Sequence, residues 1–263
     1  GSADNNGATI AIDADSASRP DLGLADGVVG AMTTGPTLPA ATIANGLPGA
    51  TNFVPNNIDP VRTTGALGRY FDVTLTNAGT TTLSGANIVI DRLTIGTAAA
   101  GLQINAGASL TTLINTTQFA GTNTVNGTLT TVGDYSLLGG ALLGSGRINA
   151  PFLTSVFGQI APGTGTSTGT LTIAGNLVLA SGSSYFANIG NGQSDLIAVV
   201  ANGTSTGSAN LGGTLNLSIT PGSTIRFGDV YTILTAAGGV TGSFAASNAL
   251  SAILRPTLVY GTN

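Results

Sequence analysis

The feature that most constrains the fold is a set of short ladders in which every second residue is aliphatic. The clearest are Leu171/Ile173 and Leu177/Leu179, which are separated by Gly175. Gly-rich or Thr-rich turns enclose these runs. A period of two with β-branched filler is typical of strands that bury one face. The sequence therefore predicts an all-β chain made of short strands and tight turns.

A short phrase recurs along the chain. It reads Asn-Gly-Thr-Leu-Thr at 126–130, Thr-Gly-Thr-Leu-Thr at 168–172 and Gly-Gly-Thr-Leu-Asn at 212–216. The copies lie about 42 and 44 residues apart, a spacing at which internal repeats indicate solenoids or arrays. We interpret the chain as a stack of strand–turn units.

The phase of the apolar ladder changes at Asp91-Arg92. Ile90 falls on the even positions, whereas Leu93 and Ile95 fall on the odd ones. A straight strand cannot change face without a bulge or a corner, so we expect a corner here with both charges outside. The other predicted core positions from Val73 onward are Val73, Leu75, Leu83, Ile88, Leu102, Ile104, Leu110, Leu113, Phe119, Val125, Leu129, Val132, Tyr135, Leu138, Leu142, Ile148, Phe152 and Val156, with Leu215 further on.

Repeated corners between short strands favour a right-handed parallel β-helix with about 20 residues per turn. The alternative is a β-sandwich, because three Asn-Gly pairs are hairpin signals. These pairs are at 126–127, 191–192 and 202–203.

Composition divides the chain into three parts. Residues 1–62 hold most of the prolines and aspartates, and we expect an N-terminal cap or linker there, with a strand near Ala8. Residues 63–157 are predicted to form β-helix turns. Residues 158–263, where strands lengthen and aromatic residues return, are predicted to be the most closely packed part.

The few ionisable residues exclude several functions. Only 7% of the 263 residues are charged, the net charge is −4, and there is no His or Cys. All acids are Asp and all bases are Arg. This composition argues against nucleic acid and anionic lipid as partners. No apolar run is long enough for a membrane-spanning helix. A chain without Cys fits export from a Gram-negative cell, and Gly1-Ser2 is typical of a cloning remnant.

The last third carries an ordered series of motifs. They are Ile160-Ala161-Pro162-Gly163, Gly169-Thr170-Leu171-Thr172-Ile173, Asn176-Leu177, Tyr185, Ser194-Asp195-Leu196-Ile197, Leu211-Gly212-Gly213-Thr214-Leu215, Tyr231-Thr232-Ile233-Leu234-Thr235-Ala236, Gly239-Val240-Thr241-Gly242-Ser243-Phe244 and Leu254-Arg255-Pro256-Thr257-Leu258-Val259-Tyr260. This order resembles the C-terminal passenger region of type V autotransporters. The match covers about residues 150–263 well and 70–150 loosely.

The resemblance implies a right-handed β-helix whose final part is similar to an autochaperone module, which folds first and templates the rest. It also implies an extracellular location at the bacterial outer-membrane surface. The expected partner in cis is an outer-membrane β-barrel translocator, which these residues do not include. Members of that family often carry a protease or lipase domain ahead of the stalk, and none is present here.

Catalysis is not expected, because the usual nucleophile–base pairs need His, Lys, Cys or Glu. Asp13-Ala14-Asp15-Ser16 is similar to the start of a calcium loop but lacks its glycine and final acid, so no metal or cofactor is predicted. A carbohydrate-active β-helix protein, lyase-like or glycan-binding, is the alternative. Its charged candidates are Asp91-Arg92 and Asp134/Arg147. An adhesin with a Thr- and Asn-rich face, binding host surfaces, glycans or its own copies, is a further alternative.

Overall fold

The computed structural model describes residues 4–5, 8–9, 72–163, 167–251 and 253–261. Among these residues none lies in a helix, and every regular element is a β-strand. The strands are β1 (Asp4–Asn5), β2 (Ala8–Thr9), β3 (Asp72–Leu75), β4 (Gly79–Leu83), β5 (Asn87–Ile95), β6 (Ala100–Ile104), β7 (Ser109–Gln118), β8 (Thr122–Val125), β9 (Thr128–Thr131), β10 (Tyr135–Leu137), β11 (Ala141–Gly144), β12 (Arg147–Ser155), β13 (Gln159–Pro162), β14 (Thr170–Leu179), β15 (Ser184–Gly190), β16 (Gln193–Ser194), β17 (Leu196–Val200), β18 (Ala209–Leu211), β19 (Thr214–Ile219), β20 (Leu234–Ala236), β21 (Val240–Gly242) and β22 (Ala246–Ser247).

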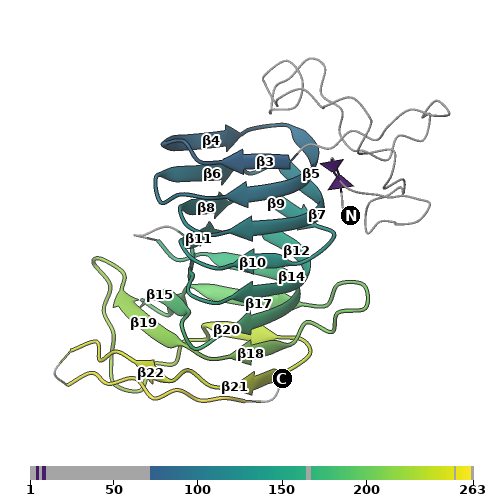
Figure 1. Ribbon diagram of the computed structural model, residues 1–263. Coiled ribbons are helices and arrows are strands. Elements are labelled where there is room, and N and C mark those ends of the chain that lie inside the picture. The colour runs from purple at the N-terminus through teal and green to yellow at the C-terminus, as the bar shows by residue number, and fades with distance from the viewer. Residues whose placement is uncertain (1–3, 6–7, 10–71, 164–166, 252, 262–263) are drawn as a thin grey trace. The chain divides into compact units, whose positions relative to one another are not determined.

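The strands stack in parallel as a β-solenoid of about six turns, which confirms the predicted fold class. One sheet has the order β22-β19-β15-β13-β11-β8-β6-β4, and Figure 1 shows β8, β6 and β4 of this sheet one above another. The other sheet has the order β20-β17-β14-β12-β10-β7-β5-β3. Because neighbouring turns pair in parallel, the β-sandwich alternative does not apply.

Hydrogen bonds between neighbouring turns measure the length of each turn. In the early turns the two hydrogen-bonded residues are 19 to 22 positions apart in the sequence. This agrees with the predicted turn length of about 20 residues. In the last turns the separation is 30 to 32 residues. The extra length lies in the loops 201–208, between β17 and β18, and 220–233, ahead of β20.

The repeated Thr-Leu phrase does not mark single turns. Leu129 pairs with Ile148, and Ile148 pairs with Ile173, so the first two copies lie two turns apart and out of register. The third copy begins β19, which belongs to the other sheet. The phrase is therefore not the structural repeat itself, but the stack of strand–turn units that its recurrence indicated is present.

The long strands bend in the middle. In β12 the register shifts between Asn149 and Phe152, and in β14 Gly175 has a φ of 140° at the equivalent place. Elsewhere the bend is a loop: β9 pairs with the first half of β12, and β10 pairs with its second half. Each long strand therefore supplies two sides of the solenoid.

The predicted corner in β5 is present as a change of face, but its charges are not both outside. Ile90 and Asp91 are both buried, Asp91 completely, whereas Arg92 is partly exposed. At such a bend two successive side chains can point inward, which a strict period of two does not anticipate.

Most of the predicted core is buried. The buried positions are Val73, Leu83, Ile90, Leu93, Ile95, Leu102, Ile104, Leu110, Val125, Leu129, Tyr135, Leu142 and Ile148, together with Leu171, Leu177 and Leu215. Leu75, Ile88, Leu113, Leu138 and Val156 are half-buried. Phe119, Val132 and Phe152 were predicted wrongly, since they are exposed and their neighbours Gln118, Thr131 and Leu153 are buried instead.

Close packing in the range 158–263 extends to Leu217. From residue 220 on, most side chains are half-exposed or exposed, although Ala236 and Phe244 are buried. The packing predicted for this range is therefore concentrated in β14, β15, β17 and β19.

By proximity of Cα atoms the chain forms two compact units. Of the described residues, one unit contains those up to Val73 together with Ile88–Leu93 and Thr111–Ile114, and the other contains Thr74–Asn87, Thr94–Leu110 and those from Asn115 on. Within the first unit, Arg92 Nη1 donates to Asp72 Oδ2 at 2.5 Å. β1 and β2 pair in antiparallel. The remainder of the predicted cap, including Asp13-Ala14-Asp15-Ser16, lies outside the described residues.

Candidate functional site

The outer surface of the nine-stranded sheet carries no charged residue on any of its strands as the structure describes them. We call it the lateral face. Its two outward columns contain Thr80, Gly101, Thr122, Ala141, Gln159, Ser184 and Thr214, and Thr82, Gln103, Thr124, Leu143, Ala161, Phe186 and Asn216.

The lateral face offers hydroxyl and amide groups in register. In one column the hydroxyls of Ser184 and Thr214 lie 3.2 Å apart, and in the other Gln103 donates to Asn105 at 2.8 Å. Uncharged hydroxyls and amides both donate and accept hydrogen bonds. Such a surface can make wide, neutral contacts, but it holds no acid–base pair.

The charged residues predicted for a carbohydrate-active site are not brought together. Arg147 lies beside Thr128 and Thr172, and its Nε donates to Asn149 Oδ1 at 2.8 Å. Asp134 precedes Tyr135, whose partner Leu153 is several residues along β12 from Arg147. The other candidates, Asp91 and Arg92, lie in the first compact unit.

A buried polar network crosses the interior in the middle of the solenoid. Tyr135 Oη donates to Gln118 Oε1 at 2.7 Å and accepts from Asn123 Nδ2 at 2.9 Å. Gln118 Nε2 donates to the carbonyls of Gly121 and Ala141, both at 3.0 Å. Burial raises the pKa of Tyr135 far above its usual value. Because its members bond to one another and to backbone, the network joins β7, β8 and β10 rather than presenting a reactive group.

Asp195 connects the turns around β15 in the same way. Its carboxylate accepts from the backbone N–H groups of Gly169 at 2.7 Å and Asn188 at 2.8 Å. Burial raises the pKa of Asp195, and these two N–H groups act in the opposite direction. Each carboxylate oxygen accepts from a backbone N–H of a different segment, so the Asp195 side chain joins the residues ahead of β14 to β15.

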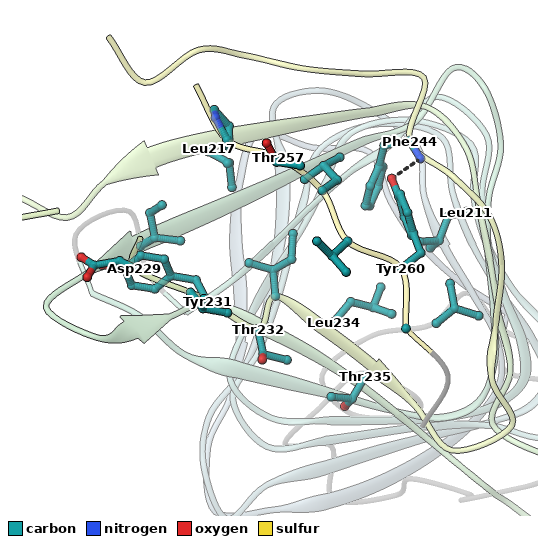
Figure 2. A pocket seen from close by; sticks show the side chains of 18 residues that line it. Leu211, Leu217, Asp229, Tyr231, Thr232, Leu234, Thr235, Phe244, Thr257 and Tyr260 are labelled. Atoms are coloured by element: carbon teal, nitrogen blue, oxygen red, sulfur yellow. Dashed lines mark hydrogen bonds between the residues drawn. The ribbon is translucent and has the colours of Figure 1, made fainter. Parts of the chain in front are cut away.

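The second candidate site is a cavity of about 490 Å³ at the C-terminal end of the solenoid, shown in Figure 2. Its floor is formed by Ile189, Leu211 and Leu217, from β15, β18 and β19. Residues 229–235 form one wall, and residues 256–261 pass over it. We call this cavity the C-terminal cavity.

The segment over the cavity alternates in burial. Leu254, Pro256 and Leu258 are half-buried, whereas the residues between them are exposed. Tyr260 Oη accepts a hydrogen bond from the backbone N–H of Phe244 at 3.1 Å, the dashed line in Figure 2. Phe244 in turn packs against Tyr185, with ring centroids 6.1 Å apart. Reasoning from the sequence did not find this cavity. The sequence feature that could have indicated the cavity is the group of aromatic residues after Phe227.

No cluster of three or more metal-ligating side chains occurs within the described part of the chain. In that same part, no helix has the length and hydropathy needed to cross a membrane. No protein-family model matches the sequence, and no curated protein is significantly similar to it. The function is therefore inferred from the two surfaces and from the fold.

Proposed function

We propose that the chain is the structural stalk and folding module of a secreted, cell-surface passenger of the autotransporter type, without catalysis of its own. The observation that carries this proposal is the continuous stack of parallel turns whose lateral face is free of charge. A solenoid of this kind positions attached parts at a distance and needs no active site. The motif order in residues 150–263 supports the same proposal.

The folding role rests on long strands with buried inward side chains between residues 170 and 219. Strand β14 spans ten residues, and β15, β17 and β19 pair with their neighbours over long registers. Leu171, Ile173, Tyr185 and Leu215 are completely buried there. Since each turn buries its core only against its neighbours, a stable set of turns can template the next one.

The test is to sequence the native gene around this region and to express the whole protein. We expect a downstream segment encoding about twelve alternating strands with aromatic ends, as in a membrane barrel. We also expect the solenoid to be cut by protease added outside intact cells. A gene without such a segment, or a solenoid that is protected until the cells are lysed, would contradict the proposal.

Adhesion through the lateral face is the finer part of the proposal. Two facing neutral surfaces avoid charge repulsion, and their hydroxyl and amide groups can pair with glycans or with a second copy. Introducing charge by Thr122→Glu with Gln159→Glu should reduce cell aggregation or glycan binding severalfold. The matched control is Thr154→Glu on β12, outside that sheet. Equal loss in both variants, or no loss in either, would argue against adhesion by this face.

A further inference from the structure

The C-terminal cavity lies where the solenoid ends in short strands. Leu211 and Leu217 are buried and line the cavity, and their strands β18 and β19 pair with β21 and β22, of three and two residues. Residues 256–261 also line it and form no strand, and Tyr260 Oη accepts a hydrogen bond from the backbone N–H of Phe244. The short final strands and this segment therefore leave an apolar cavity between them.

The volume of about 490 Å³ lies within the range of about 300–1,000 Å³ typical of small-molecule sites. A mostly apolar lining with a few polar groups is also typical of such sites. Figure 2 shows Asp229 and Tyr231 at the same end of the cavity, and the hydroxyls that also line it belong to Thr232, Thr235, Thr257 and Tyr260.

The rim determines which chemistry fits. Asp229 Oδ2 accepts from the backbone N–H of Arg226 at 2.8 Å and from Tyr231 Oη at 3.2 Å. Among the described residues that line the cavity, Asp229 is the charged one. A carboxylate accepts hydrogen bonds but repels anions, so it favours a neutral hydroxyl or amine over a fatty acid or sulfonate.

We propose that the C-terminal cavity binds an apolar small molecule that carries an uncharged hydrogen-bond donor. The apolar body lies against Leu211, Leu217 and Leu234, and the donor faces Asp229. This site is independent of the stalk role, since it would operate whether or not a barrel follows.

Two fluorescent probes with the same ring system test the proposal on the full chain. N-phenyl-1-naphthylamine is neutral and carries an N–H donor, whereas 8-anilinonaphthalene-1-sulfonate adds an anionic group. We expect the neutral probe to bind saturably at one site per chain. The anionic probe should bind roughly tenfold more weakly.

Filling the cavity should abolish this binding. Val240→Phe introduces a ring beside the floor of the cavity and should weaken binding of the neutral probe by about tenfold or more. Val132→Phe, in an exposed loop between β9 and β10, is the matched control and should change nothing. If circular dichroism shows that Val240→Phe is unfolded, Thr257→Phe on the covering segment makes the same test.

A substitution that removes the charge of Asp229 provides the second test. Asp229→Asn keeps an oxygen acceptor and removes the negative charge. The affinity of the chain for the anionic probe should therefore rise about threefold to tenfold. Asp134→Asn removes an exposed charge elsewhere and should leave both probes unaffected. Binding of the neutral probe that survives cavity filling would overturn the proposal. Equal binding of the two probes to the unaltered chain would overturn it as well.

Discussion

Tyr135 and Tyr185 are the two largest side chains that the solenoid buries completely. They occupy different polar settings. Tyr135 bonds to two side-chain amides inside the core, whereas Tyr185 Oη donates to the backbone carbonyl of Ile233 at 2.5 Å. A buried group that loses its partner costs about 1–3 kcal/mol of stability. The polar groups that each hydroxyl would leave unpaired therefore rank the two tyrosines.

Tyr135→Phe is expected to lower the free energy of unfolding by about 2–4 kcal/mol, because Gln118 Oε1 and Asn123 Nδ2 both lose the phenol as hydrogen-bond partner. Tyr185→Phe removes the donor to the carbonyls of Ile233 and Asp195, but the Ile233 carbonyl still accepts from the Ile197 N–H, so it should cost about 1–2 kcal/mol. Urea denaturation followed by circular dichroism measures both values. Equal costs would mean that the amide network adds nothing to stability.

The same two phenols give a pH prediction. Burial raises the pKa of both Tyr135 and Tyr185 above the ordinary value of 10.0. A group with a raised pKa in the folded state contributes its stability fully below the unfolded pKa, and this contribution is lost as the pH rises above about 10. We expect both phenolate signals to appear only together with the loss of the strand signal in circular dichroism. Ionisation of both with the strand signal intact would contradict their burial.

At the scale of single elements, the bend in β14 depends on Gly175. Its φ of 140° is unfavourable for L side chains, and a Cβ there would lie 1.6 Å from the carbonyl oxygen of Ala150 in the neighbouring turn. Gly107 also has a positive φ, of 85°, but a Cβ there would meet nothing within 4 Å. The two glycines thus separate backbone strain from crowding between turns.

Gly107→Ala is expected to cost about 1–2 kcal/mol, from backbone strain alone. Gly175→Ala should cost clearly more, since β12 must also move away from β14. Thermal unfolding of the two variants beside the unaltered chain gives the comparison. If Gly175→Ala were no worse than Gly107→Ala, the turns would be less closely stacked at the bend than described.

The apolar residues at every second position of the strands form the core of the solenoid. Leu171, Leu177 and Leu215 are at most 1% exposed, so replacing any of them with Ala should cost about 2–5 kcal/mol. Val132→Ala is the control, since this side chain is 60% exposed and should cost little. The midpoints of urea denaturation measure the stability of all four variants. Near-neutral substitutions at the three leucines would mean that the buried face is assigned wrongly.

Strand type and most buried positions followed from the sequence because burial on one face imposes a period of two. The exceptions have two causes. At the bend in β5, Ile90 and Asp91 are both buried, and around Gln118 a polar network replaces apolar packing. Gln118 is buried because it bonds to the carbonyls of Gly121 and Ala141, which pushes Phe119 outward. Hydropathy alone ranks Phe119 above Gln118, so the period was assigned out of phase.

At the scale of the whole molecule, the candidate surfaces were less predictable than the fold. The lateral face is visible in the sequence as a scarcity of charge, but its columns exist only once the register between turns is known. The C-terminal cavity depends on segments far apart in the chain, such as Leu211 and Tyr260, whose proximity leaves no periodic signal. By contrast, the absence of His and Cys already limited the chemistry available to any site.

If residues 158–263 are the folding module, the turns after Gly158 must support those before it. The most direct measurement is circular dichroism with urea unfolding on two shortened chains, one without residues 158–263 and one without residues 1–60. We expect the first to lose the strand signal of residues 63–157 and the second to unfold cooperatively, close to the unaltered chain. Equal stability of the two shortened chains would contradict the role of residues 158–263 as the folding module.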